Sequence, residues 1–251
     1  MYGRVFASVY NAWWGDFARR VGPQVLDFYA GTPLGSTNDR VLDLCCGTGQ
    51  FAADALTRGY EVEGIDISED MLYHARQNNL EHVQSGRATF RAGDAGDFTT
   101  DGGFGLVVSM FDALNHLPDA ERLAGCFRSV LGALAAGGIF VFDLNTRLGL
   151  LNWNSISVRD EPGIMIVNRG MFIEDQHRAI VRISGFLRDE SGRYERFEET
   201  MSNTAFDLVE VRDLLLASGF QRAYCARPGS LGIPLDTDPE QERRVYFVAY
   251  K

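Results

Sequence analysis

A strand-like segment that runs into two closely spaced glycines constrains the fold of this chain more than any other feature. Residues 41–52 read VLDLCCGTGQFA, so an apolar run leads through Gly47 and Gly49 into a helical pattern that begins at Gln50. Glycine permits a sharp turn and a close approach of the backbone to a ligand. The N-terminus of the following helix offers free N–H groups, and Asp43, at the end of the strand, would face the same crevice. The segment therefore predicts a ligand site beyond the carboxyl end of the strand.

Strand-like and helical segments alternate along most of the chain. Apolar strand-like runs are expected at 40–45, 61–66, 88–92, 104–110 and 139–143. Helical patterns separate them, with Gly59 at the end of one helix and Ser68 as the N-cap of the next. A last helix over 209–216, ended by Gly219, precedes two strands near 220–226 and 243–250. This order predicts an α/β fold with a doubly wound, mostly parallel seven-stranded sheet and helices on both faces.

The alternation breaks between residues 150 and 205. Three β-like runs are expected near 164–172, 178–187 and 194–203, with turns at Asp175-Gln176 and Ser191-Gly192. Consecutive strands joined by short turns predict an antiparallel β meander. We therefore expect a cofactor-binding core formed by 1–149 and 206–251, with helical residues at 1–30, and an inserted substrate lid at 150–205.

The glycine turn fits two nucleoside cofactors. Residues 47–52, followed by Asp66 after the second strand, satisfy the spacing of a dinucleotide-binding motif. In either cofactor Asp66 would accept hydrogen bonds from ribose hydroxyls; alternatively, it only caps the next helix. Asp94, after the third strand, favours S-adenosylmethionine, because a second acid at a strand end suits an exocyclic adenine amine, with Ala95 beside the ring.

Other interpretations of the turn stay open. A nicotinamide-dependent oxidoreductase is the alternative enzyme, although Asp94 and the absence of any lysine before Lys251 weaken it. Asp94 alone also fits an ordinary surface acid. A non-catalytic module that binds the cofactor without transferring a group is a further alternative.

Five stretches, taken in order, resemble the successive motifs of class I S-adenosylmethionine-dependent methyltransferases. They are VLDLCCGTG, EGIDIS, RAGDA, FGLVVSMFDALNHL and GGIFVFDLN. The resemblance covers residues 1–149 and the C-terminal helix and strands. The N-terminal VYNAWW and the insertion after DLN are similar to a bacterial subgroup that includes small-molecule and sugar N-methyltransferases. The resemblance implies a Rossmann-like enzyme whose cofactor is S-adenosylmethionine.

The resemblance also implies which residues hold the cofactor. It assigns the methionine part to Asp43, Cys45, Gly47 and Gly49. It assigns the ribose to Asp66, the adenine to Ile67, Met71, Asp94 and Ala95, and the neighbourhood of the sulfonium to Met110. Tyr10 would close the site from the N-terminal helix. The chain departs from the family at Cys45, where glycine or alanine is usual, but cysteine is small and apolar enough to preserve the packing.

Residues after the fourth strand are candidates for the acceptor side. A sulfonium methyl needs mainly alignment, and a general base helps only if the nucleophile must lose a proton. His116 lies just past the strand and is the candidate catalytic base. The alternative is a histidine at a helix entry that binds backbone or water. Asp112 and Asn115 are secondary candidates for orienting the substrate.

Several large side chains near the insertion either line the acceptor pocket or belong to the core. They are Trp13, Trp14, Arg147, Trp153, Met171 and Phe172. Core packing is the commoner role of aromatic side chains, and we favour it here.

Charge and composition exclude several classes of function. The chain has 34 acidic and 24 basic residues, a formal charge of -10, which disfavours nucleic acid as a partner. No apolar run reaches the roughly 18 residues of a membrane span. The cysteines and histidines lack metal-ligand spacing, which indicates a reduced, cytoplasmic protein without a metal site. We expect a small-molecule acceptor, methylated at an amine or a hydroxyl; the sequence does not indicate an oligomeric state.

Overall fold

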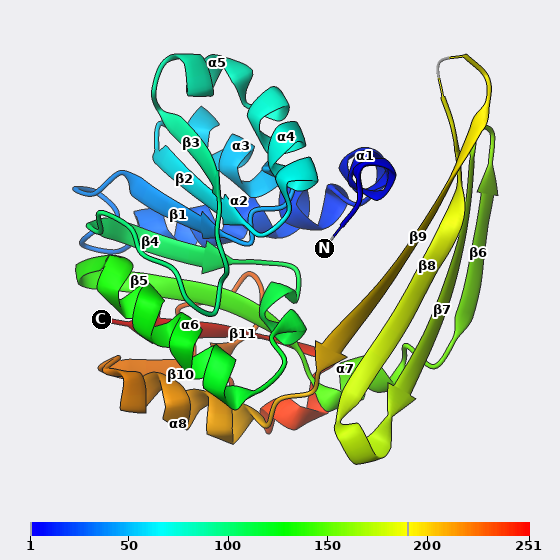
Figure 1. Ribbon diagram of the computed structural model, residues 1–251. Coiled ribbons are helices and arrows are strands. Elements are labelled where there is room, and N and C mark those ends of the chain that lie inside the picture. The colour runs from blue at the N-terminus through cyan, green and yellow to red at the C-terminus, as the bar shows by residue number, and fades with distance from the viewer. Residues whose placement is uncertain (1, 190) are drawn as a thin grey trace.

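A seven-stranded sheet with the order β10-β11-β5-β4-β1-β2-β3 forms the centre of the molecule (Figure 1). Its strands are β1 (Arg40–Leu44), β2 (Glu61–Asp66), β3 (Ala88–Ala92), β4 (Phe104–Ser109), β5 (Leu134–Asn145), β10 (Arg222–Ala226) and β11 (Arg244–Tyr250). The first five run parallel, and β11 pairs antiparallel with both β5 and β10. The computed structural model describes residues 2–189 and 191–251. The predicted doubly wound, mostly parallel sheet is confirmed.

Two apolar layers cover the two faces of this sheet. On one face lie α2 (Asp16–Ala30), α3 (Gln50–Thr57) and α4 (Glu69–Asn78), and on the other α6 (Ala120–Ala133) and α8 (Leu208–Ser218). Strands covered on both faces are expected to be apolar throughout, and β4 is buried along its whole length. The parallel strands therefore direct their carboxyl ends toward one edge of the core (Figure 1).

The predicted signals at helix ends are confirmed. Ser68 caps α4, since its Oγ accepts a hydrogen bond of 3.3 Å from the backbone N–H of Met71. Gly59 follows α3 with a φ of 97°, and Gly219 follows α8 with a φ of 113°. A left-handed glycine at this position ends a helix without steric cost.

The start of β5 differs from the prediction of a strand over 139–143. The residue after α6, Leu134, is already extended, so β5 begins there without a loop. Gly137 and Gly138 lie within the strand, where its register against β4 shifts between Phe104 and Leu106. The two glycines therefore accommodate an irregularity in the sheet rather than ending the helix.

A four-stranded antiparallel sheet, ordered β6-β7-β8-β9, is inserted after β5 and the short helix α7 (Arg147–Leu151). The three predicted runs correspond to β7 (Ile164–Ile173), β8 (Arg178–Arg188) and β9 (Tyr194–Thr204). The prediction missed the edge strand β6 (Ile156–Glu161). All six of its residues are exposed, and three of them are charged, so no buried alternation marked it.

Helix α1 (Arg4–Trp13) lies between the core and the inserted sheet (Figure 1). The helical stretch predicted at 1–30 is divided into α1 and α2 by a break at Trp14-Gly15. Phe6 and Val9 of α1 share one apolar cluster with Met71 of α4 and Phe197 of β9. The N-terminal helix therefore joins the cofactor side of the core to the insertion.

Short helical segments complete the chain. They are α5 (Leu80–Gln84) and 3-10 turns at Ala113–His116, Glu174–Gln176 and Pro239–Gln241. Within the described residues, no helix combines the length and the apolar character that crossing a bilayer requires.

Candidate active site

The turn between β1 and α3 has the left-handed backbone that its glycines predict. Gly47 and Gly49 have φ values of 54° and 78°, and Cys45 also adopts a positive φ of 60°. A Cβ on Gly49 would lie 2.8 Å from Nδ2 of Asn79, which donates a hydrogen bond to the carbonyl of Gly49. Glycine is therefore required at 49 by conformation and by close packing against the end of α4.

Asp66, at the end of β2, connects the two loops that border the crevice. Its Oδ2 accepts a hydrogen bond of 2.9 Å from the N–H of Gly47, and its Oδ1 accepts one of 2.9 Å from the N–H of Ser68. Because Ser68 itself caps α4, Asp66 is not merely the cap of that helix. Two backbone donors leave half of the lone pairs of the carboxylate for a ligand.

Asp43, at the end of β1, is a buried acid without a complete set of partners. Its side chain is 2% exposed, and its Oδ2 has no hydrogen-bond partner among the residues that the structure describes. Burial, reinforced by the charge of Asp66, raises the pKa of Asp43 to about 8. An unpaired carboxyl oxygen in a buried crevice favours a cationic or hydrogen-bond-donating ligand group.

Asp94, after β3, lies farther along the same edge of the sheet. Its Oδ1 accepts a hydrogen bond of 2.8 Å from the N–H of Gly96. Its Oδ2 accepts one of 2.5 Å from Nη2 of Arg122, on α6. The Asp94 side chain is 46% exposed, so it also faces the outside of the crevice. Ala95, beside it, is half-buried.

The N-terminal segment covers the glycine turn. A Cβ on Gly47 would contact the ring of Tyr10 at 3.7 Å, so Tyr10 lies directly over the turn. Tyr2 is also directed into the crevice: burial raises the pKa of its phenol well above the usual range, and the charges of Asp112 and Asp66 raise it further. The carbonyl of Tyr2 accepts a hydrogen bond of 3.2 Å from Oγ of Ser68.

The remaining predicted cofactor residues differ in exposure. Met71 and Met110 are buried, at 1% and 8% exposure, and pack within the structure. Ile67 is 54% exposed beside Asp66. An exposed isoleucine next to a strand-end carboxylate presents an apolar surface that a planar ring can cover.

His116 ends the 3-10 turn that follows β4, and it faces the inserted sheet. Its Nδ1 lies 3.2 Å from the carbonyl of Ser202, on β9. A carbonyl only accepts, so Nδ1 carries the proton and Nε2 of the neutral ring is left with a lone pair. Interaction with His116 lowers the pKa of Asp66, although burial raises it more.

A buried ionic network links the segment after β4 to the insertion. Asp143 of β5 accepts hydrogen bonds from the N–H groups of Phe111 and Asp112, at 2.6 and 2.9 Å. Arg244 of β11 donates to Asp112 at 2.7 Å and also to Asp143. Asn203 of β9 donates to the other oxygen of Asp112 at 2.8 Å. Phe111 and Asp112 have positive φ values of 66° and 49°, so the network holds a strained turn.

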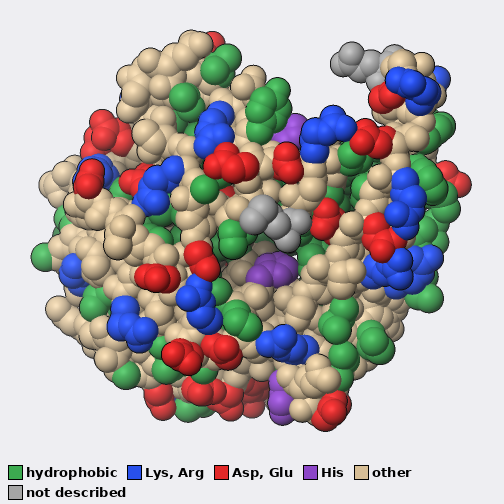
Figure 2. Space-filling model, viewed as in Figure 1, with side chains coloured by type: hydrophobic (Ala, Val, Ile, Leu, Met, Phe, Trp, Pro, Cys, Tyr) green, Lys and Arg blue, Asp and Glu red, His purple; other side chains and the backbone are tan. Residues whose placement is uncertain are grey.

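The crevice opens toward the inserted sheet. The carboxyl ends of the core strands are directed toward that sheet, and Figure 2 shows this face hollowed between the two parts, with acidic and basic side chains around the hollow. The arrangement therefore combines a glycine turn, two buried strand-end acids and a histidine with a free ring nitrogen at one edge of the sheet.

Known proteins are similar to this chain in sequence. A family model described as "Methyltransferase domain" matches residues 41–138. The chain is 31% identical over 217 residues to the putative methyltransferase YqeM of Bacillus subtilis, covering 84% of each protein. It is 34% identical over 186 residues to the dTDP-3-amino-3,4,6-trideoxy-alpha-D-glucopyranose N,N-dimethyltransferase of Streptomyces venezuelae, covering 73% of this chain and 76% of that protein.

The chain is a class I S-adenosylmethionine-dependent methyltransferase.

The fold of the methyltransferase agrees with solved structures over its whole length. An S-adenosylmethionine-dependent methyltransferase from Clostridium acetobutylicum has a TM-score of 0.80, with 19% identity and 98% and 97% coverage of the two chains. Streptomyces venezuelae DesVI has a TM-score of 0.74, with 23% identity and 99% coverage of each chain. Both likenesses include the inserted sheet, because nearly the whole chain is covered.

The residues at the crevice of the methyltransferase fit its cofactor. S-adenosylmethionine carries an ammonium and a carboxylate on its methionine part, two ribose hydroxyls and an adenine. The orphaned Oδ2 of Asp43 suits a donor such as the ammonium, and the free lone pairs of Asp66 suit hydroxyl donors. At Gly47, the absence of a Cβ keeps the space beside the Tyr10 ring free.

Most of the large side chains near the insertion belong to apolar clusters. From the sequence, they were expected either to line the acceptor pocket or to belong to the core. Trp13 and Trp14, at the end of α1, pack against the apolar cluster of Phe6 and Val9, and Trp153 packs in the cluster of Phe172. Arg147 pairs with Glu174 and lies over the ring of Phe172. Met171, by contrast, is 54% exposed. Packing therefore accounts for the aromatic residues, as we favoured from the sequence.

Asn115, a secondary candidate for orienting the substrate, is occupied by the backbone. Its Nδ2 donates to the carbonyls of Asn145 and Thr204, at 3.0 and 2.9 Å. Its Oδ1 accepts from the N–H of Asn145 at 2.9 Å. The side chain thus joins the end of β5 to the end of β9 and has no free donor for a substrate.

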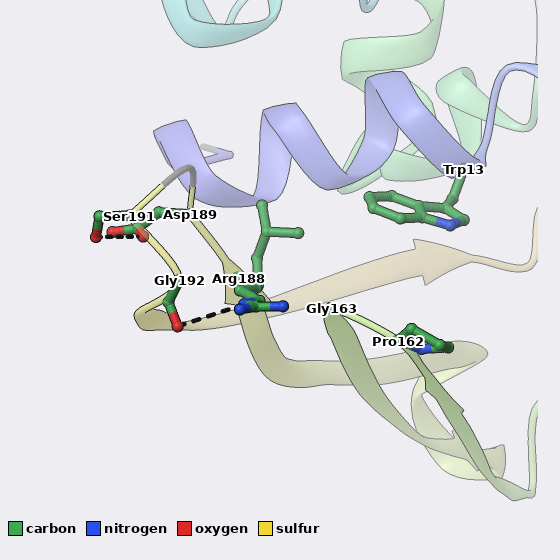
Figure 3. A pocket seen from close by; sticks show the side chains of 8 residues that line it. Trp13, Pro162, Gly163, Arg188, Asp189, Ser191 and Gly192 are labelled. Carbon is green, nitrogen blue, oxygen red and sulfur yellow. Dashed lines mark hydrogen bonds between the residues drawn. The ribbon is translucent and has the colours of Figure 1, made fainter.

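A separate pocket of about 560 Å³ lies at the hairpin tips of the inserted sheet (Figure 3). Trp13 of α1 extends over it, and the other lining residues are Pro162, Gly163, Leu187, Arg188, Asp189, Ser191 and Gly192. None of the residues predicted to bind the cofactor lines this pocket. Hydrogen bonds from Arg188 to Gly192 and from Ser191 to Asp189 brace the hairpin from within.

Three residues near the crevice escaped the sequence analysis: Tyr2, Arg122 and Arg244. Tyr2 stands outside every recognised motif. Arg122 and Arg244 act across long separations, of 28 residues to Asp94 and 132 residues to Asp112. For Arg244, one sequence signal was available: it is a basic residue at the start of the last strand, near the strand ends that carry Asp43 and Asp66.

Among the described residues, no group of three or more His, Cys, Asp or Glu side chains could hold a metal ion.

Proposed function

We propose that this methyltransferase methylates a small molecule at an amine or hydroxyl group, with His116 as the general base. The observation that carries this proposal is the contact of 3.2 Å between Nδ1 of His116 and the carbonyl of Ser202. Donation from Nδ1 to this carbonyl supports the tautomer in which Nε2 accepts a proton, and Ser202 belongs to the insertion, so His116 lies at its boundary with the core. A positioned imidazole of this kind typically contributes 10²- to 10⁴-fold to a rate.

The proposed cofactor site follows the edge of the sheet. Asp43 would hold the ammonium of the methionine part, Asp66 the ribose hydroxyls, and Asp94, with Ala95, the adenine edge. Glycines 47 and 49, with Cys45 and Tyr10, would enclose the methionine part. Ile67 and Met71 would border the adenine ring, and Met110 the sulfonium. The burial and unpaired oxygen of Asp43 support the first assignment, and the two backbone anchors of Asp66 support the second.

The mechanism needs alignment and one proton transfer. S-adenosylmethionine supplies a methyl group that is already activated by a positively charged sulfur. His116 would accept the proton that a nucleophilic amine or hydroxyl loses during attack. Burial raises the pKa of Asp66 and its interaction with His116 offsets part of that rise, so a positively charged ring at 116 would favour the carboxylate form of Asp66. The Arg244 network would hold the backbone at 111–112 while the acceptor binds.

Residues 150–205 would form the lid over the acceptor. Gly3 donates a hydrogen bond of 2.7 Å to Glu199 of β9, and Ser202 and Asn203 contact the turn after β4. The insertion thus borders the acceptor side from two directions, and a bound acceptor between it and the core would be shielded from part of the solvent. The charges of Asp66, Asp112 and Glu199 all act on the phenol of Tyr2, so this part of the crevice favours a cationic amine group of the acceptor over an anionic group.

The similarity to the Streptomyces venezuelae N,N-dimethyltransferase supports an amine acceptor on a sugar nucleotide as the first class to test. The experiment measures transfer of labelled methyl to nucleotide-linked amino sugars, free amino sugars, aliphatic amines, phenols, tRNA and protein. Transfer to a small amine or hydroxyl compound, lost in His116→Gln, is the expected result. Transfer to tRNA or protein alone would refute the proposal.

A further inference from the structure

We infer that Arg122 is a positioning residue that sets the preference of the cofactor site for adenine. The inference rests on the proposed function, in which Asp94 binds the adenine edge. Arg122 lies on α6, outside the strand-end loops that form the site.

The contact between Arg122 and Asp94 fixes the orientation of the carboxylate. Nη2 of Arg122 donates to Oδ2 at 2.5 Å, while the N–H of Gly96 donates to Oδ1 at 2.8 Å. Each oxygen therefore has one protein donor and one lone pair left. Without Arg122, a side chain that is 46% exposed would be held by a single backbone bond and would be free to rotate into solvent.

The loop that carries Asp94 also rests directly on α6. A Cβ on Gly96 would lie 2.7–2.8 Å from the guanidinium atoms of Arg122, so the guanidinium lies flat against this glycine. A Cβ on Gly125 would lie 2.4 Å from the carbonyl oxygen of Gly96. Ser129, one turn farther along, accepts a hydrogen bond of 3.2 Å from the N–H of Phe98. Residues 122, 125 and 129 share one face of the helix, which therefore forms a platform for the loop.

This geometry favours an amine over a carbonyl at position 6 of a purine. Both oxygens of Asp94 accept hydrogen bonds from protein donors, Nη2 of Arg122 and the N–H of Gly96, and a carboxylate in this arrangement offers a ligand only acceptor lone pairs. The 6-amino group of adenine donates, whereas the 6-oxo group of hypoxanthine accepts and would face the carboxylate unpaired. A site built for a hydrogen-bond donor rejects an analogue that lacks it. Arg122 thus affects which base binds, beyond supporting the fold.

Arg128 provides a matched control. Arg122 and Arg128 both lie on α6, and both line a groove of about 590 Å³ between this helix and residues 96–100. Arg128, however, makes no hydrogen bond to Asp94. A methionine at 122 or at 128 keeps most of the side-chain volume and removes the charge.

The test is calorimetric binding of S-adenosylhomocysteine and S-inosylhomocysteine to the full chain and its variants. Wild type and Arg128→Met should share a strong preference for the adenine compound. In Arg122→Met that preference should fall about tenfold, the loss expected for one charge-assisted hydrogen bond, and Arg122→Lys should recover part of it. Gly125→Ala, which displaces the loop without changing charge, should lower the preference as well.

Equal weakening of both ligands in Arg122→Met, with their ratio unchanged, would show a merely structural role and overturn the inference. If Arg122→Met fails to fold, the other two variants decide. A ratio of the two affinities that stays at the wild-type value in both Gly125→Ala and Arg122→Lys would then overturn the inference. If wild type binds neither compound, the proposed function fails instead, so the two failures are distinguishable.

Discussion

The N–H of Gly47 donates a hydrogen bond of 2.9 Å to Oδ2 of Asp66, joining the glycine turn of β1 to the end of β2 across 19 residues. The same carboxylate accepts from Ser68, so one side chain fixes both loops that border the crevice. The relative position of these two loops thus depends on a single side chain.

Replacing Asp66 with asparagine should weaken S-adenosylhomocysteine binding by about 10- to 100-fold. The amide oxygen replaces only one of the two acceptors, so a backbone donor loses its partner and the site loses a charged acceptor. Isothermal titration calorimetry measures the loss. Glu69→Gln, an exposed neighbour on α4, is the control and should bind as wild type does. Unchanged affinity in Asp66→Asn would contradict the assignment of Asp66 to the ribose.

Binding of S-adenosylhomocysteine should strengthen as pH rises from 6 to 8 and level off above the pKa of Asp43, about 8. Below that pKa the buried carboxyl is protonated, and an ammonium ligand must displace the proton, which gives up to about tenfold in affinity per pH unit. Calorimetry across this range checks the slope. Asp43→Asn should bind weakly and with little of the slope; a full slope in that variant would place the titrating group elsewhere.

The stability of the free enzyme should change with pH in the opposite direction. The pKa of Asp43 is raised from 3.8 in the unfolded chain to about 8 in the fold, so between these values the folded state holds more protons. The free energy of unfolding therefore falls as pH rises from 4 to 8, by at most about 1.4 kcal/mol per pH unit from this group. Urea denaturation at several pH values should show a smaller fall in Asp43→Asn.

His116→Gln should reduce methyl transfer by about 10²- to 10⁴-fold at neutral pH and leave the affinity for S-adenosylhomocysteine within about twofold. The imidazole contacts the insertion through Ser202 and is not assigned to the cofactor, so its loss acts on the chemical step. His177→Asn, in the exposed turn before β8, is the matched control, because asparagine tolerates the left-handed backbone at that position. Wild-type turnover in His116→Gln would exclude it as the base.

Arg244→Met should lower the free energy of unfolding by roughly 3 kcal/mol, because it leaves Asp112 and Asp143 buried without their cation. Denaturant titration measures this change. Arg243→Met alters an exposed neighbour that contributes no side chain to the network and should change stability by under about 0.5 kcal/mol. An unchanged free energy of unfolding in Arg244→Met would show that the ion pairs of Arg244 with Asp112 and Asp143 do not stabilise the fold.

The sequence predicted the elements whose signals are local. The glycine turn, the cap at Ser68 and the helix end at Gly219 each depend on a few neighbouring residues, and all three are confirmed. Strand β6 was missed because an exposed edge strand carries no alternation of burial. The start of β5 was misplaced because Gly137 and Gly138, which lie within it, interrupt the apolar run by which a strand is recognised.

The position of a candidate site residue was predictable where the residue belongs to a local sequence motif. Asp43 and Asp66 stand at strand ends and could be placed from their strands alone. Arg122, Arg244 and Tyr2 could not, because their roles depend on which distant element lies beside them in space. Asp112 and Asn115 were visible after β4, yet their partners on β9 and β11 show that they brace the fold.

The bond from Asn203 to Asp112, with that from Asn115 to the carbonyl of Thr204, anchors the last inserted strand in the interior of the core. These polar side chains lose their hydrogen-bond partners if the inserted sheet or the core unfolds while the other stays folded. Partial melting of the insertion is therefore costly, and the chain should denature in one cooperative transition, with amide hydrogens at the base of β9 exchanging as slowly as those in the central sheet.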